Sequence, residues 1–542
     1  MIGLIDLPTE TLQTIAHEVG AGSWSNNIPQ QLTPFRTVCK LLNSIVEPFL
    51  FSEIALNTHP GALSTTTIPF CKALCNRTDS ASGEANNGLA IHVRNLKLRT
   101  YSTRPQGPCT DDGTVSESWQ ELLIHTLSSL INLRKIVWVL SQDTPDWMYA
   151  QIPLVLSKLP SFSVFEVNGD QGWLQSYPNL FPLDRLKNLQ TLVIKADNLP
   201  NSGFDSCILR PLSIALKNSP ALQELEINGP QPKMGEPTHS LHDLLENVTT
   251  TAPLKITKLS VQNLNMDIDP AFSSHLKCLT CVDVMNWRRN GKTGNFWTML
   301  QKGNVCLEDL RVDSEIDGTL LKYLQEFHSG LKSLRLSGAA SSFTDAESDE
   351  VAGLFYGSVL PKLAGNLHQL SVNPSYEGDW CFGLHNIEVF SKCLNLEHLN
   401  VCLKLREVDD LIVSTTLLVD SFVAFTDAIT TPMLTAGKQI PLLNMAHSLP
   451  KLRGLSLSSA DTTSNRGATC GNSSMSYHHN IMEKIHEALR NTTPAEAHAN
   501  SALRISGFMR SYSVCREEDG SLKYRESSWF NGDIKVVPAG QN

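Results

Sequence analysis

The segment Gly291-Lys292-Thr293 is the first candidate for chemistry, because it resembles the end of a phosphate-binding loop. The glycine that such a loop requires five residues before Gly291 is replaced by Asn286, and Trp287 occupies a stretch that needs small residues. We therefore predict a surface turn at this segment and no bound nucleotide cofactor.

Two further clusters contain side chains that can bind metals. Cys278 and Cys281 form one C-x-x-C pair on an expected strand, with no second pair at zinc spacing, so we predict core residues. His478 and His479 lie in the Ser/Asn-rich stretch 461–480 with no carboxylate close in sequence, which favours a loop. The sequence also contains no G-x-S-x-G and no H-E-x-x-H motif. It therefore predicts no catalytic residue, no metal and no cofactor, and we expect a binding protein rather than an enzyme.

Length, charge and cysteine usage exclude several classes of protein. At 542 residues the chain exceeds one compact core, so it is multidomain or a solenoid. The formal net charge of −10 argues against nucleic acid as a partner. The 13 scattered cysteines favour reduced thiols over a disulfide framework. With no basic signal region and no apolar run near 18 residues, we expect a soluble protein of the cytoplasm or the nucleus, without membrane contact.

One spacing of apolar residues, L-x-x-L-x-L with any aliphatic or aromatic residue allowed, recurs along most of the chain. Nine of the ten intervals between successive copies fall between 23 and 36 residues, which approximates the period of leucine-rich repeats. Chance matches in a conventional α/β protein are the alternative, but they would not be so regularly spaced. The eleven copies begin at Leu133, Phe162, Leu189, Leu222, Ile256, Leu279, Leu307, Leu331, Leu367, Leu396 and Leu452, and a degenerate copy begins at Val93.

Each copy predicts a short strand whose alternate residues point inward, and stacked neighbours can bury the face that one repeat cannot. Helical patterns at 209–219, 240–248, 320–329 and 386–394 alternate with these strands. The predicted fold class is therefore α/β, an irregular leucine-rich-repeat solenoid with a parallel sheet on the concave face of a horseshoe. We expect it to span residues 89–460, after a linker and first cap at 57–88.

The outward strand residues form an extended surface on which a protein target could bind. Charged residues of both signs occupy it, and acidic ones predominate near the centre. Ordinary solubilising charges are the alternative for any single position. The predicted target-binding residues of the concave face are Glu224, Glu226, Asp309, Arg311, Asp313 and Arg335.

Residues 1–56 show helical instead of strand periodicity. A Leu-Pro-x-Glu start at 7–10, a Val-Cys-Lys triplet at 38–40 and an apolar close at 48–51 stand in that order. In this order of landmarks the segment resembles the F-box family, although the link at 21–31 is longer than usual and an aromatic residue after the triplet is missing. A plain helical cap on the solenoid is the alternative. The resemblance implies adaptor-binding residues at Leu7, Pro8, Leu12, Ile15, Val38, Cys39 and Leu42.

An F-box followed by leucine-rich repeats resembles the substrate-recognition subunits of cullin-RING (SCF-type) ubiquitin ligases, including large fungal sets. The resemblance implies a Skp-type adaptor and a cullin scaffold as partners, and a protein target held by the repeats within the ubiquitin conjugation pathway. Two alternatives stay open: a non-degradative interaction scaffold, and an enzyme within the C-terminal region. For residues 461–542 we predict a loop, a helix at 481–491 and a hairpin at Asp519-Gly520.

Overall fold

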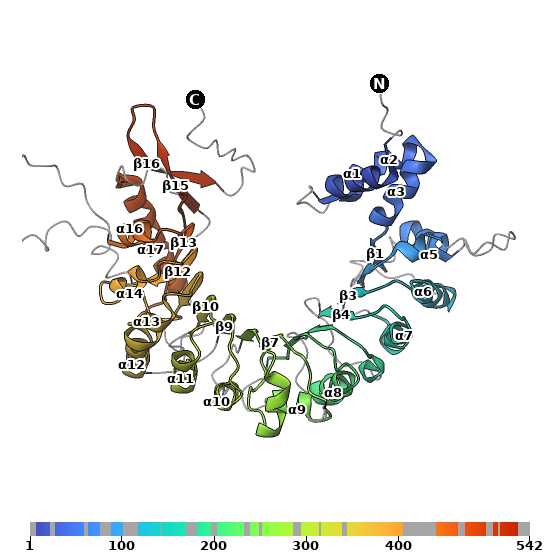
Figure 1. Cartoon of the computed structure of the whole chain (residues 1–542), viewed down its shortest axis with the longest axis horizontal. Helices are drawn as coiled ribbons and strands as arrows, with labels where there is room; N and C mark the ends of the chain where they lie inside the picture. The colour runs from blue at the N-terminus through green and yellow to red at the C-terminus, as the bar shows by residue number, and fades with distance from the viewer. Residues whose placement is uncertain are drawn as a thin grey trace, which may run out of the picture. The chain divides into compact units, whose positions relative to one another are not determined.

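A computed structural model of the chain divides into two compact units (Figure 1). Unit 1 comprises Met1–Leu264 with Ser274–Leu276, and unit 2 comprises Asn265–Ser273 with Lys277–Asn542. The structure describes residues 7–21, 28–58, 63–75, 88–100, 117–141, 144–169, 181–196, 203–231, 239–248, 252–285, 294–313, 316–338, 344–404, 441–463, 472–494, 502–507 and 510–528.

Unit 1 begins with three packed helices, α1 (Thr9–Ala21), α2 (Ile28–Val38) and α3 (Lys40–Leu50). A small apolar core holds them together, since apolar residues recur on one face of each helix. Partly buried side chains of Leu7, Val19 and Phe35 pack around this core. The buried members of the core are Leu12, Ala16, Leu32, Leu42, Ile45 and Val46.

The rest of unit 1 alternates strands with helical segments. Its strands are β1 (Glu53–Asn57), β2 (Asn95–Arg99), β3 (Lys135–Leu140), β4 (Val164–Gly169), β5 (Thr191–Lys195), β6 (Glu224–Asn228) and β7 (Lys258–Gln262). Its helical segments are the π-helical η2 (Leu63–Thr67) and η6 (Asp205–Leu209), the 3₁₀ turns η4 (Leu89–His92) and η5 (Leu183–Arg185), and α5 (Ile68–Cys75), α6 (Glu117–Ser129), α7 (Asp146–Leu156), α8 (Arg210–Lys217) and α9 (Leu241–Leu245). The seven strands pair in chain order and all in parallel.

Unit 2 repeats the same alternation. Its strands are β8 (Cys281–Met285), β9 (Asp309–Asp313), β10 (Ser333–Ser337), β11 (Gln369–Asn373), β12 (His398–Leu403), β13 (Gly454–Ser459), β14 (Arg504–Gly507), β15 (Arg510–Arg516) and β16 (Leu522–Ser528). Its helical segments are α10 (Gly294–Lys302), α11 (Gly318–Glu326), α12 (Asp345–Leu354), η8 (Phe355–Val359), α13 (Leu360–Leu363), α14 (Ile387–Ser391), α16 (Pro441–Ser448) and α17 (Asn472–Asn491), and η7 (Pro270–Leu276) precedes β8. Strands β8 to β14 pair in parallel.

The inward leucines of successive strands stack in register, as the repeat pattern predicts. In unit 1, Leu192 of β5 lies opposite Leu225 of β6. In unit 2, Leu310, Leu334 and Leu399 occupy the same row on β9, β10 and β12. All five side chains are at most 1% exposed, whereas the residues between them are half-buried or exposed. Each unit is therefore a stretch of leucine-rich-repeat solenoid, with its core between the sheet and the helical segments.

The sheet extends further at both ends than the repeat pattern predicts. Strand β1 begins at Glu53 and pairs with β2, so the solenoid starts well before residue 89. At the other end β14 adds a parallel strand beside β13. The predicted hairpin is present, since β15 and β16 pair antiparallel across a turn in which Gly520 has a φ of 82°. A positive φ is the conformation that glycine tolerates best.

Two predictions about local structure are wrong. His478 and His479 do not lie in a loop, because α17 begins at Asn472 and includes both of them. Cys278 precedes strand β8 and is exposed, and Cys281 is only half-buried, so this pair does not belong to the core. The alternation places Cys281 at an outward strand position. Gly291-Lys292-Thr293 lies outside the described residues.

Candidate binding surfaces

The helical bundle of unit 1 contains all seven predicted adaptor-binding residues, but it places them differently. Leu12 and Leu42 are 3% exposed and form part of the bundle core. Leu7 and Ile15 are half-buried on α1 or just before it, and Pro8 is exposed directly before α1. Burial gives Leu12 and Leu42 a structural role, whatever contacts they make with a partner.

The Val-Cys landmark has a clear local function. Cys39 separates α2 from α3 in an extended conformation, and its Sγ accepts a hydrogen bond from the Leu42 backbone N–H at 3.5 Å. The thiol therefore caps the N-terminus of α3, where backbone donors otherwise lack partners. Val38 ends α2 with 64% of its surface exposed, and Leu41 opens α3 with 41% exposed. The junction of the two helices thus presents two large apolar side chains to solvent.

The outward strand residues of unit 1 include the predicted Glu224 and Glu226. Glu224 is exposed, whereas Glu226 forms an ion pair of 3.1 Å with Lys195 on the neighbouring strand. Two strands earlier, Lys135 pairs with Glu166 at the same distance. The charges of this surface are thus largely neutralised by one another, and we call strands β3–β6 with these two ion pairs the charged face.

Glu166 illustrates the electrostatics of the charged face. Burial alone would raise the pKa of its carboxyl, but hydrogen bonds from Asn168 and Lys135 outweigh burial and hold the pKa below its ordinary value. Asn168 Nδ2 donates to Glu166 Oε1 at 3.0 Å. The carboxylate is therefore ionised and already satisfied by its own neighbours.

The other four predicted target-binding residues lie on β9 and β10 of unit 2. Arg311 approaches Asp283 of β8 at 3.8 Å, and Arg335 lies opposite Arg311 in register. Burial raises the pKa of Asp313 above its ordinary value, while Arg311 opposes that shift. Asp309 occupies the same strand two residues before Arg311. These side chains form one mixed-charge cluster in unit 2, and whether it binds a target stays a prediction.

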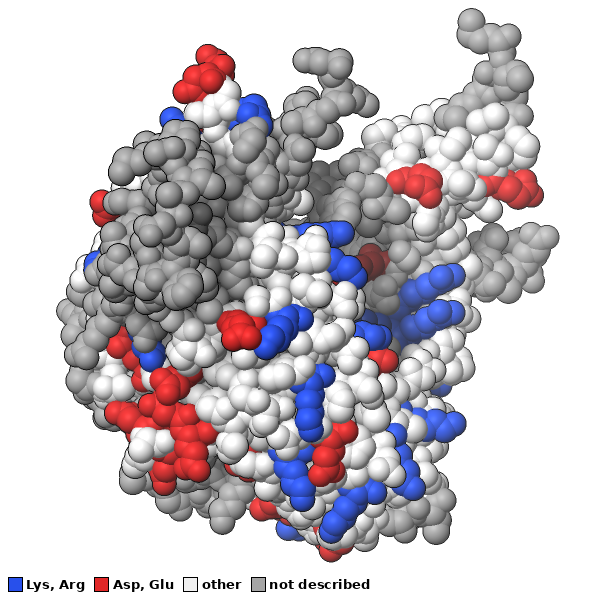
Figure 2. Space-filling model, turned by 60° about the vertical axis from the view of Figure 1, so that its left-hand side comes forward, with Lys and Arg blue, Asp and Glu red and all other residues white. Residues whose placement is uncertain are grey.

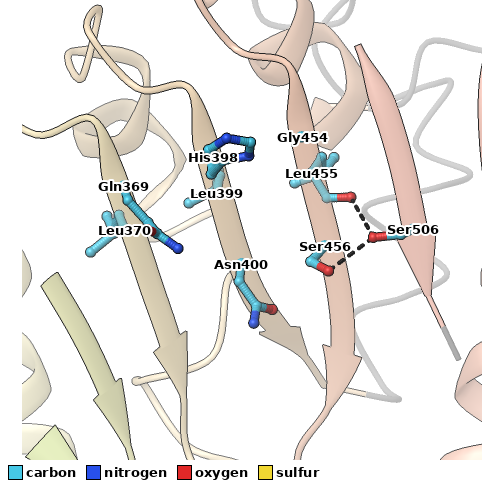
Figure 3. Close-up of a pocket in the computed structure, with 9 residues that line it drawn as sticks. All are labelled: Gln369, Leu370, His398, Leu399, Asn400, Gly454, Leu455, Ser456 and Ser506. Carbon is cyan, nitrogen blue, oxygen red and sulfur yellow. Dashed lines mark hydrogen bonds between the residues drawn. The ribbon is translucent and has the colours of Figure 1, made fainter. Parts of the chain in front are cut away.

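Unit 2 also contains a surface depression that sequence reasoning missed. It lies on the outward side of β11–β14, with a volume of about 250 Å³ (Figure 3). We call it the notch. Its floor is made by backbone and apolar residues of those strands. Its polar lining consists of Gln369, His398, Asn400, Ser456 and Ser506, and Gly454 lies between them.

Charged side chains are interspersed with large uncharged areas on the face that Figure 2 shows. Among the described residues, no group of three or more histidine, cysteine or carboxylate side chains is arranged to hold a metal ion. None of the helices in the described part of the chain is long and apolar enough to cross a membrane. None of the eleven described cysteines forms a disulfide bond.

No protein-family model matches the chain, and no curated protein matches its sequence. Among solved structures, the yeast complex of Rad7 and Elc1 is similar at 12% identity with a TM-score of 0.32, over 73% of this chain and 88% of that chain. The Drosophila complex of Toll and Spatzle is similar at 14% identity with a TM-score of 0.30, over 68% of this chain and 47% of that chain. Both TM-scores lie below 0.5, so these similarities indicate neither the fold nor the function of the chain.

Proposed function

We propose that the chain is a substrate-recognition subunit of a cullin-RING ubiquitin ligase. In this proposal the N-terminal bundle is an F-box that docks a Skp-type adaptor, and the outward strand surfaces hold a protein target. The chain carries out no bond chemistry itself. It raises the effective concentration of the target near a ubiquitin-charged enzyme by tethering both to one scaffold.

The observation that carries the proposal is the helix junction of the bundle. The F-box landmarks occur in order within a three-helix bundle that has its own core, and the Val-Cys landmark coincides with the cap between α2 and α3. Val38 and Leu41 stand exposed on either side of that cap. Exposed apolar side chains that cluster at one place are typical of protein interfaces.

Adaptor pull-down with purified full-length chain tests the proposal. Val38→Glu should weaken capture of a Skp-type adaptor about tenfold or more, because a central apolar anchor is replaced by a charge. The side chain is already exposed, so the bundle should stay folded. Ile131→Glu is the matched control, since Ile131 is an apolar residue of unit 1 that is 47% exposed and lies outside the bundle.

Equal capture by the wild type and Val38→Glu would contradict the adaptor assignment. Co-purification of a cullin together with the adaptor separates ligase work from a non-degradative scaffold. Failure to recover a cullin while the adaptor binds would favour the scaffold.

A further inference from the structure

The notch exists because one repeat has no outward side chain at a position where its neighbours have one. In the register of the sheet, Gly454 of β13 lies between His398 of β12 and Arg504 of β14. A Cβ atom at Gly454 would lie 2.7 Å from Nδ1 of His398, closer than such atoms approach. The glycine therefore keeps this part of the strand face open and lets the imidazole ring lean across it.

The polar lining of the notch is uncharged and partly without partners. The Gln369 Oε1 atom accepts a hydrogen bond from Arg335 Nη2 at 3.1 Å, and Figure 3 shows the carboxamide nitrogen of Gln369 directed toward β12. Ser456 and Ser506 hydrogen-bond each other at 2.9 Å. The Asn400 Oδ1 atom is shielded from solvent and has no hydrogen-bond partner among the described residues. An unpaired buried acceptor costs about 1–3 kcal/mol, so its presence calls for an explanation.

The outward residues Asn373, Cys402 and Ser458, one row further along the same strands, behave differently, and so does Ser371, which lies opposite Asn400. Asn373 Nδ2 donates to Ser371 Oγ at 3.0 Å, and Ser458 Oγ donates to Asn373 Oδ1 at 3.2 Å. Cys402 lies 3.0 Å from the Ser458 hydroxyl. These side chains satisfy one another within the sheet. Asn168 Oδ1 and Ser333 Oγ at other outward positions are also shielded without a partner among the described residues, so it is the unpaired oxygen together with the space left open by Gly454 that distinguishes the notch.

The charged side chains nearest the notch lie outside its lining. Its lining contains neither a carboxylate nor a lysine or arginine. Arg335 of the adjacent strand β10 donates a hydrogen bond to Gln369. Strand β10 pairs with β9, which carries Asp309 and Asp313. A cation would find no carboxylate within the lining. An anion would meet the unpaired oxygen of Asn400, with the exposed Arg504 beside Gly454 as the one neighbouring positive charge in that row.

A primary carboxamide matches what the lining offers. It carries one N–H₂ donor group and one carbonyl acceptor in the same plane, so it can donate to Asn400 Oδ1 and accept from the amide nitrogen of Gln369. The terminal torsion of an asparagine side chain is soft, which allows the shielded oxygen of Asn400 to turn toward an entering donor. A carboxylate of the same shape has no donor for that oxygen.

We propose that the notch binds the side-chain carboxamide of an asparagine or glutamine residue in a protein target. The inference rests on the target-binding half of the proposed function and names the chemistry recognised there. It does not involve the adaptor.

Ligand-observed saturation-transfer NMR on the full-length chain tests the inference. The probes are three acetylated, amidated tripeptides, Ala-Gln-Ala, Ala-Glu-Ala and Ala-Met-Ala, which share one backbone and nearly one side-chain length. The glutamine peptide should bind about three- to tenfold more tightly than the other two, which corresponds to one or two net hydrogen bonds. A glutamate peptide that binds as well overturns the proposal in favour of an anion site, and an equal methionine peptide overturns it in favour of apolar contact.

Two variants locate the signal. Gly454→Ala should abolish the preference for glutamine, because the added methyl group displaces His398 across the notch. Gly365→Ala is the matched control, since a Cβ there meets nothing within 4 Å. Asn400→Asp keeps the side-chain shape and should also abolish the preference. A preference that survives both notch variants places the binding elsewhere and overturns the proposal.

The adaptor is absent from this experiment. Loss of the glutamine preference therefore leaves the adaptor pull-down unaffected, and failure of the pull-down leaves the peptide result unaffected. The two proposals can thus fail separately.

Discussion

The charged face of unit 1 and the notch of unit 2 occupy equivalent outward positions of the repeats, yet their polar groups are paired differently. On the charged face the ionised lysines and glutamates pair with one another, although the neutral Asn168 Oδ1 atom has no partner among the described residues. On the charged face, Lys135 and Lys195 each contact a glutamate of the next strand at 3.1 Å. In the notch, the Asn400 oxygen has no partner and Gly454 supplies no side chain at all. Charge density is therefore a poor guide to binding on such a sheet, because paired charges are already satisfied, whereas unpaired neutral groups are available to a ligand.

The inward sides of the sheet in the two units should be energetically alike, and this is the largest effect we expect. Leu334→Ala in unit 2 and Leu192→Ala in unit 1 should each lower the free energy of unfolding by about 2–5 kcal/mol, through lost burial and a cavity. Both side chains are fully buried. Urea unfolding followed by circular dichroism measures the loss. The outward Ser337→Ala is the control, and a loss of the same size there would contradict the stacked-leucine core.

Substitutions of outward residues in the two regions should change the free energy of unfolding in opposite directions. Asn400→Leu removes an unpaired acceptor, so the free energy of unfolding should stay unchanged or rise by up to about 1 kcal/mol. Such a gain would indicate that the asparagine is retained for binding at some cost in stability. The same urea titration measures it. A loss of more than about 1 kcal/mol would instead give Asn400 a structural role.

The stability that the charged face contributes should depend on pH, and it should be well below that of the buried leucines. Glu166→Gln should cost about 0.2–1 kcal/mol at pH 7, the usual range for a partly exposed ion pair. Because the pKa of Glu166 is lowered in the folded chain, its contribution is present above the pKa of the unfolded chain and is lost as the pH falls through the folded pKa.

Urea titrations of the wild type and Glu166→Gln at pH 7 and pH 3 measure this prediction. The difference between the two proteins should shrink at pH 3, where Asn400→Leu should keep its effect. A Glu166→Gln difference that is the same at both pH values would mean that the carboxylate is not what stabilises the pair.

The strands could be predicted because each one carries two inward apolar residues at the same spacing, and a strand exposed on both faces would not require them. The apolar pattern failed where those residues are small or were already assigned to another element. In β14 the inward side includes Gly507, so the template finds no leucine there. In β1 the apolar residues Ile54 and Leu56 follow the bundle directly and fall within residues 1–56, which the sequence assigns to the N-terminal helical segment.

The binding surfaces were only partly predictable. Alternation correctly places Glu226, Arg311 and Arg335 on the outward side, but it cannot say that Glu226 is paired with a lysine 31 residues earlier in sequence. The notch depends on the register of His398 against Gly454, which are 56 residues apart. A glycine leaves no sign in an apolar pattern. Only the sheet register reveals what its missing side chain exposes.

The antiparallel hairpin at the end of unit 2 has a consequence for assembly. A parallel repeat array has no intrinsic end, because its last strand offers the next copy the same register that every internal strand uses. Strand β15 reverses the chain direction beside β14, and β16 carries Lys523 and Arg525 in its middle. The two antiparallel pairings, β14 with β15 and β15 with β16, therefore end the parallel pairing of the repeats at β14. Lys523 and Arg525 stand on the edge strand of the described sheet, and such charges oppose the pairing of a strand from a second molecule and thus end-to-end polymerisation into fibres.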